Sequence, residues 1–136
     1  ESCTGGTIAS KFTAMAGASA YFMACVVSYS NEAKHDILGV SWESLNIYGA
    51  VSEQVAREMA EGMRRVAHAD YAIATTGIAG PTGGSEAKPV GTVWMAVATP
   101  NGTIARMRNC GTDRSQIISR ASAYAIEMLY DHIKNM

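Results

Sequence analysis

The stretch Val90–Cys110 reads VGTVWMAVATPNGTIARMRNC. Its two halves, Val90–Thr99 and Thr103–Cys110, contain the β-branched and other apolar residues that favour strands. Between them, Pro100-Asn101-Gly102 is typical of a tight hairpin turn. The stretch therefore predicts two antiparallel strands joined by a short connection.

Helix and strand signals alternate along the rest of the chain. A near-continuous apolar run at Tyr21–Tyr29 predicts a strand buried on both faces, and a shorter run predicts a strand at Tyr71–Thr75. Helical periodicity and capping residues predict helices at 6–16, 31–38, 41–48, 52–66 and 113–134. The alternation predicts one α/β domain over residues 1–136. We expect three layers, a mixed and mostly parallel sheet with helices on both faces, and the hairpin as an antiparallel edge.

The composition is that of a globular protein, with 48% hydrophobic and 17% charged residues among 136. A net charge of −1 provides little attraction for a nucleic-acid backbone, and no apolar stretch reaches the ~18 residues of a membrane-spanning helix. Three widely spaced cysteines without a CxxC pair predict reduced thiols rather than a metal site. We therefore expect a cytoplasmic protein with no metal, no cofactor, and no nucleic-acid or membrane partner.

The first candidate site is the glycine turn Glu1-Ser-Cys-Thr-Gly-Gly6, which leads into the first predicted helix. Ser2 at this turn has the hydroxyl of a nucleophile, while Thr4, Gly5 and Gly6 belong to a backbone that can bind a phosphate or an oxyanion. Taken alone, the segment is equally compatible with Ser2 or Thr4 acting only as a helix cap. Cys3 is an alternative nucleophile, although no histidine lies nearby in sequence to lower its pKa.

A serine nucleophile needs a base, and Lys34 follows the predicted strand at the beginning of the next helix. Burial there would lower the lysine pKa and leave a neutral amine to accept the serine proton. A solvated surface lysine is the simpler alternative. Tyr29 is placed to hydrogen-bond either group and relay the proton, or to serve as a structural anchor at the strand end.

Two further segments carry candidate ligand-binding residues. The loop 76–84 is glycine-rich, so that Thr76 and Gly77 at its start are suited to bind a phosphate or a sugar. Arg114, at the beginning of the last helix, offers a bidentate fork for phosphate or carboxylate, or simply pairs with Asp113 or Glu127. In an acyl-transfer site, amides near Gly5 or Gly77 would hold the oxyanion.

Five motifs together resemble the CinA carboxy-terminal domain, the nicotinamide-nucleotide amidase family, over essentially the whole chain. They are Glu1-Ser-Cys-Thr-Gly-Gly6, Tyr29-Ser-Asn-Glu-Ala-Lys34, Gly49-Ala-Val-Ser52, Thr76-Gly-Ile-Ala-Gly-Pro81 and Lys88-Pro-Val-Gly-Thr-Val93. The resemblance implies hydrolysis of nicotinamide mononucleotide to nicotinic acid mononucleotide and ammonia, with Ser2 as nucleophile, Lys34 as base and Tyr29 in support. It also implies substrate contacts from Thr76 and Arg114, and a homodimer or higher homo-oligomer.

Other functions are compatible with the same residues. One is a non-catalytic nucleotide-binding or assembly module of a larger CinA-like protein, and another is an esterase or amidase for a different small substrate.

Family members usually have some tens of residues, forming a helix and a strand, before the Glu1–Gly6 motif. We therefore expect the sequence to be an N-terminally incomplete domain.

Overall fold

The computed structural model describes residues 1–136 and contains a three-stranded sheet flanked by helices. Strands β1 (Ala72–Gly77), β2 (Thr92–Thr99) and β3 (Gly102–Asn109) lie in the order β1-β2-β3. Both pairings are antiparallel. The hairpin prediction is confirmed, with β2 and β3 paired from Thr99 and Gly102 outward. The expectation of a mostly parallel sheet is wrong, because no two neighbouring strands run in the same direction.

Five α-helices surround the sheet, and each begins close to its predicted start. They are α1 (Thr7–Thr13), α2 (Asn31–Leu38), α3 (Trp42–Tyr48), α4 (Glu53–Ala67) and α5 (Arg114–Lys134). Ser41, Ser52 and Asp113 accept the amide hydrogen bonds expected of helix caps. The cap of α2 is Ser30, because the Ser30 hydroxyl accepts the Ala33 amide.

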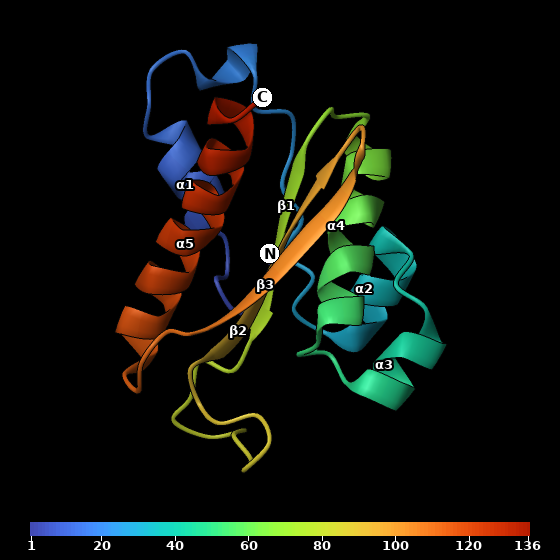
Figure 1. Cartoon of the computed structure of the whole chain (residues 1–136), viewed down its shortest axis with the longest axis vertical. Coiled ribbons are helices and arrows are strands. Elements are labelled where there is room, and N and C mark those ends of the chain that lie inside the picture. The colour runs from blue at the N-terminus through green and yellow to red at the C-terminus, as the bar shows by residue number, and fades with distance from the viewer.

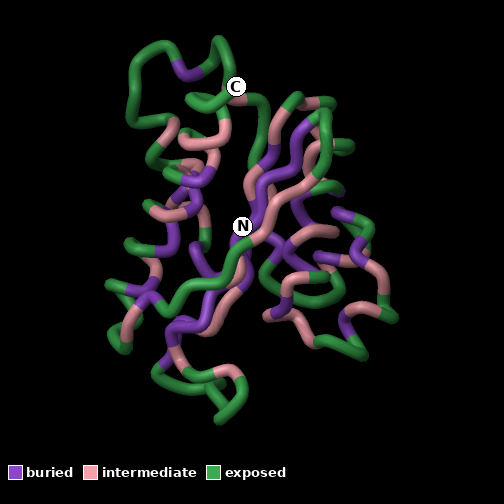
Figure 2. Tube along the Cα trace, in the orientation of Figure 1, coloured by how far each residue is buried: buried purple, intermediate pink, exposed green.

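The helices cover opposite faces of the sheet: α1 and α5 lie on one side, and α2, α3 and α4 on the other (Figure 1). Successive side chains of β2 point to opposite faces of the sheet, so this strand contacts the helices on both sides. Val93, Met95 and Val97 belong to the core cluster with α5. Ala96 and Ala98, with the alanines of β1, face α4 and let that helix lie close to the sheet. Buried residues therefore run along β2 and along the inner sides of α4 and α5 (Figure 2).

The predicted strand at Tyr21–Tyr29 is wrong. After a short 3-10 helix at Ala18–Ala20, this segment runs without strand pairing, and Met23 and Tyr29 are 65% and 62% exposed. Beyond its link to the preceding 3-10 helix, its backbone bonds to another segment are Glu1 N–H to Val26 O (2.8 Å) and Ser28 N–H to Glu1 O (2.8 Å). Apolar composition predicted burial, but no neighbouring strand lies along most of the segment. Its apolar side chains instead line a groove shared with β1 and the ends of α4 and α5.

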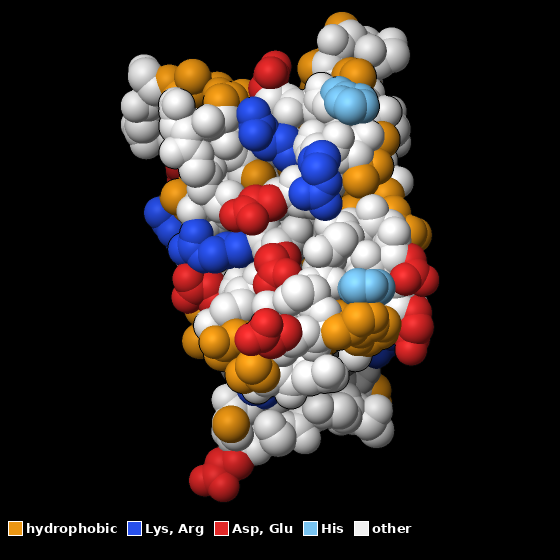
Figure 3. All heavy atoms as spheres, turned by 90° about the vertical axis from the view of Figure 1, so that its right-hand side faces the viewer, with side chains coloured by type: hydrophobic (Ala, Val, Ile, Leu, Met, Phe, Trp, Pro, Cys, Tyr) orange, Lys and Arg blue, Asp and Glu red, His pale blue; other side chains and the backbone are white.

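The outer face of α2, α3 and α4 carries both signs of charge. Acidic and basic side chains are interspersed there with apolar ones (Figure 3). None of the helices combines the length and apolarity needed to cross a membrane. The predicted site residues come together away from this face, at the point where the turn before α1 meets the beginning of α2 and the end of β1.

Candidate active site

Ser2 lies on a turn whose shape depends on glycine. Gly5 and Gly6 adopt φ angles of 57° and 103°, a left-handed region that residues with a Cβ seldom occupy. The Gly5 amide donates to the Ser2 carbonyl at 3.0 Å, which closes the turn directly after the serine. The turn holds the Ser2 side chain at the sheet edge, where the residue is 7% exposed.

Lys34 reaches Ser2 from α2. Its Nζ lies 3.2 Å from Ser2 Oγ, 2.9 Å from the Ser28 carbonyl oxygen and 3.4 Å from the Tyr29 carbonyl oxygen. The residue is 2% exposed, and this burial lowers the pKa of the Lys34 amine below its ordinary value. A neutral amine has two hydrogens for the two carbonyls and a lone pair for the Ser2 hydroxyl. The geometry therefore fits a serine beside a lysine base.

A cavity of about 330 Å³ opens beside this pair. Its lining includes Ser2, Lys34, Tyr29, Thr76, Gly77 and Arg114, six of the nine residues predicted for the site. Thr76 is held by a hydrogen bond from its hydroxyl to the Ala50 carbonyl at 2.8 Å. Arg114 donates to the Gly80 carbonyl and, at 3.3 Å, to the hydroxyl of Tyr29. The lining of the cavity thus includes a hydroxyl, an amine and a guanidinium.

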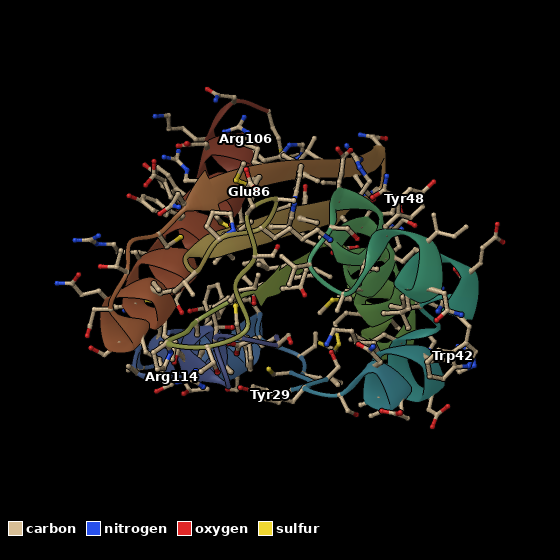
Figure 4. All side chains as sticks on the ribbon, turned by 90° about the horizontal axis from the view of Figure 1, so that it is seen from below. Tyr29, Trp42, Tyr48, Glu86, Arg106 and Arg114 are labelled. Atoms are coloured by element: carbon tan, nitrogen blue, oxygen red, sulfur yellow. The ribbon has the colours of Figure 1, made fainter.

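The tyrosine contact differs from expectation. The Tyr29 hydroxyl accepts from Arg114 and makes no hydrogen bond to Ser2 or Lys34; only its backbone carbonyl contacts the lysine. Figure 4 shows Tyr29 along the lower edge of the view, between Arg114 and Trp42 of α3. Tyr29 is 62% exposed and lies at the cavity rim.

Three predicted ligand-binding residues do not line the cavity. Thr4 is 1% exposed, and its hydroxyl is engaged with Glu1 and Thr75. Gly5 and Gly6 shape the turn, and their amides donate to the Ser2 carbonyl and the Glu1 carboxylate. The Gly5 amide is therefore not free to contact an oxyanion in this structure.

Two other amides belong to residues that line the cavity, Cys3 and Gly77. The Cys3 amide, next to Ser2, donates to no backbone carbonyl. The Ile78 amide donates to the Thr92 carbonyl, so the preceding pair, Gly77 and Val93, is a non-hydrogen-bonded pair of the ladder. Consequently the Gly77 N–H faces away from β2. A side chain at this position would place Cβ 2.8 Å from the Thr92 carbonyl oxygen, which accounts for the glycine.

Cys3 is a poor alternative nucleophile in this geometry. Its side chain lies in the core cluster with Cys110 and Ile117, and the residue is 6% exposed. Burial raises the pKa of the Cys3 thiol to about 11, so the thiolate is disfavoured at neutral pH. No group of three or more His, Cys, Asp or Glu side chains in the chain is arranged to hold a metal ion.

Comparison with known proteins agrees with the motifs. The model of the CinA C-terminal domain matches residues 1–133. The chain belongs to the CinA C-terminal domain family. Among curated members, it is 52% identical to the nicotinamide-nucleotide amidohydrolase PncC of Escherichia coli K12 over 131 residues, 96% of this chain and 79% of that protein. It is 50% identical to a CinA-like protein of Fervidobacterium nodosum, covering 95% of this chain but only 32% of that protein.

Solved structures of the family have the same fold. A competence/damage inducible protein from Agrobacterium tumefaciens has a TM-score of 0.93 and 45% identity, covering 96% of this chain and 80% of the other. A CinA superfamily protein from Klebsiella pneumoniae has a TM-score of 0.95 and 36% identity, covering 99% and 84%. The chain thus spans about four fifths of the PncC-length family members and about a third of the longer ones.

The sequence indicated the main pair of residues but missed their supports. The carbonyls of Ser28 and Tyr29 around Lys34 carry no side-chain signal, and Ala50 and Val51, which line the cavity, belong to a motif without an assigned role. Glu1 opened the first motif without an assigned role. Its carboxylate is the most heavily hydrogen-bonded side chain near Ser2.

Proposed function

We propose that this chain is a nicotinamide-nucleotide amidase, which hydrolyses nicotinamide mononucleotide to nicotinic acid mononucleotide and ammonia. The observation that carries the proposal is the 3.2 Å contact between Lys34 Nζ and Ser2 Oγ, made by a lysine that is 2% exposed. A hydroxyl beside a desolvated amine is suited to nucleophilic acyl transfer. The name of the PncC relatives supplies the substrate.

The reaction proceeds through an acyl-enzyme. Ser2 Oγ attacks the carboxamide carbon while Lys34 takes the hydroxyl proton, and the amides of Cys3 and Gly77 stabilise the oxyanion. Lys34 then returns the proton to the leaving nitrogen, ammonia departs, and a water molecule activated by Lys34 hydrolyses the ester. Arg114 and Thr76 line the cavity and bind the nucleotide portion of the substrate.

Ammonia release from nicotinamide mononucleotide tests the proposal. We expect Ser2→Ala and Lys34→Met to lose at least about 100-fold in kcat, the scale of general acid-base catalysis. The matched controls are Ser10→Ala and Lys11→Met, both exposed positions on α1. Full activity in Ser2→Ala or Lys34→Met would remove that residue from the mechanism. Ammonia released equally by the parent and both variants would end the proposal.

The same samples separate the other candidate functions. Saturable calorimetric binding of the nucleotide with no ammonia release would indicate a binding module. Hydrolysis of simple esters without hydrolysis of the nucleotide would indicate an esterase that uses the same Ser2 and Lys34.

A single domain over residues 1–136, a homodimer or higher homo-oligomer, and a cytoplasmic location remain predictions. Light scattering on the purified chain measures the oligomeric state.

A further inference from the structure

Glu1 is a buried acid that the proposed mechanism does not use. The residue is 8% exposed, and its two carboxylate oxygens accept five hydrogen bonds. Three donors are backbone amides at the beginning of α1, those of Gly6 (3.2 Å), Ile8 (3.0 Å) and Ala9 (2.9 Å). The Thr4 hydroxyl donates at 2.5 Å and the Cys25 thiol at 3.4 Å.

This carboxylate takes the place of a cap on α1. Gly6 stands at the N-cap position and has no side chain to accept the first amides, so Glu1 accepts them from five residues earlier. Burial raises the pKa of the Glu1 carboxyl, but hydrogen bonds from Thr4, Ala9 and Ile8 outweigh burial and keep that pKa below its ordinary value. The amides of α1 are thus used within the protein, and the substrate is left with the amides of Cys3 and Gly77.

Glu1 also orders a chain of hydroxyls that reaches the sheet. Thr4 Oγ1 lies 2.8 Å from Thr75 Oγ1, and both threonines are at most 1% exposed. A hydroxyl has one hydrogen, and Thr4 gives its hydrogen to the carboxylate. Thr75 must therefore donate to Thr4. The turn carrying Ser2 is linked by this chain to the strand that ends at Thr76 and Gly77.

We infer that Glu1 is a positioning residue for the nucleophile: its carboxylate holds the Ser2 turn against β1, so that Ser2 Oγ faces Lys34 while the Cys3 and Gly77 amides face one cavity. The inference rests on the proposed function for the role of Ser2. It predicts that changing Glu1 alters the reactivity of Ser2 far more than it alters substrate binding, because Glu1 does not line the cavity with Arg114 and Thr76.

Glu1→Gln is the sharpest variant because it keeps the shape and removes one acceptor oxygen. A carboxamide NH₂ cannot accept a hydrogen bond, so whichever way the amide points, at least two of the five donors lose their partner. The matched control is Glu127→Gln, an exposed position on α5. Both variants are measured per folded molecule, with the folded fraction taken from circular dichroism.

Two readouts separate this inference from the proposed function. The first is phosphonylation of Ser2 by a small alkyl fluorophosphonate, in which the Oγ–P bond forms, fluoride leaves and Lys34 takes the proton. The rate is measured from the intact mass of the protein over time. Ser2→Ala is the blank. We expect Glu1→Gln to be at least tenfold slower than the parent and Glu127→Gln to be unchanged. The second is ammonia release, for which we expect kcat to fall at least tenfold and KM to change less than threefold.

The outcomes are distinct. A parent that is phosphonylated at Ser2 but releases no ammonia would refute the proposed function and leave Glu1 testable by the first readout. A phosphonylation rate within twofold of the parent in Glu1→Gln would overturn the inference. So would a loss confined to KM. If Glu1→Gln does not fold, Thr75→Val and Thr75→Ser decide: the inference requires slower phosphonylation in Thr75→Val and recovery of the rate in Thr75→Ser, which restores the hydroxyl.

Discussion

Gly62→Ala is a substitution for which helix propensity predicts a gain in stability and packing predicts a loss. Gly62 lies within α4, where alanine is favoured over glycine by about 1 kcal/mol. A Cβ at this position, however, would lie 1.9 Å from the carbonyl oxygen of Leu38, and contacts under 3.0 Å essentially never occur. Leu38 is the last residue of α2, so that helix would have to move by at least about 1 Å.

The displacement is expected to lower both stability and activity. Overpacking costs about 1–3 kcal/mol, and a backbone contact with little freedom to yield falls at the upper end. After the propensity gain, the free energy of unfolding should fall by about 2 kcal/mol, or about 6–10 °C in Tm. Lys34 lies one turn before Leu38 on α2, so we also expect kcat to fall about 10- to 100-fold, because a misplacement of about 1 Å has costs of that order.

Thermal unfolding followed by circular dichroism, together with ammonia release per folded molecule, measures both effects. Glu61→Ala is the matched control, because Glu61 is the exposed neighbour on α4 and its substitution should change the free energy of unfolding by less than about 0.5 kcal/mol. An unchanged or higher Tm in Gly62→Ala would refute the reasoning. It would mean that α2 and α4 are not in the close contact from which the prediction is derived.

Three further predictions concern the site. Ammonia release should rise with pH through a midpoint below 10.5, because burial lowers the pKa of Lys34 and only the neutral amine accepts a proton; a midpoint at or above 10.5 would contradict this assignment. Cys3→Ala should keep kcat within about threefold of the parent, since burial raises the pKa of that thiol to about 11, whereas a 100-fold loss would transfer the nucleophile's role to Cys3. Arg114→Ala should raise KM about tenfold, the scale of one charge-assisted contact, and leave the pH midpoint in place; an unchanged KM would mean that the guanidinium does not bind substrate.

Local features of the fold, including the β2–β3 hairpin, were predictable from sequence, whereas pairing between segments far apart in the sequence was not. Ser41 and Ser52 accept the amide hydrogen bonds expected of helix caps, and the turn at Pro100-Asn101-Gly102 joins two strands, because these features depend on a few neighbouring residues. The Tyr21–Tyr29 segment shows the limit. Its apolar composition is shared by buried strands, but whether a segment pairs depends on partners elsewhere in the chain, about which composition contains no information.

The candidate site shows the same division. Motif spacing indicated Ser2 and Lys34, but it carried no information about the orientation of Tyr29 or about which amides remain free. Glu1 and Thr75 were missed because they act on Ser2 through Thr4, and the contact between Thr4 and Thr75 joins residues 71 positions apart. Buried threonines are common in strands, so nothing in the local sequence distinguishes Thr75 from an ordinary packing residue.

Burial of Lys34 links the chemistry of the site to the stability of the fold. The folded state lowers the pKa of this amine below the value of 10.5 that it has in the unfolded chain, so the unfolded chain binds the proton more tightly. The free energy of unfolding therefore rises with pH from the folded-state pKa toward 10.5, and at lower pH the full cost of burying the amine is present. A lysine that served only for packing would be selected against, because burying its amine lowers the stability of the fold. Lys34 directs all three polar contacts of its amine to Ser2 and the Ser28–Tyr29 backbone, which supports a chemical rather than a structural reason for its position.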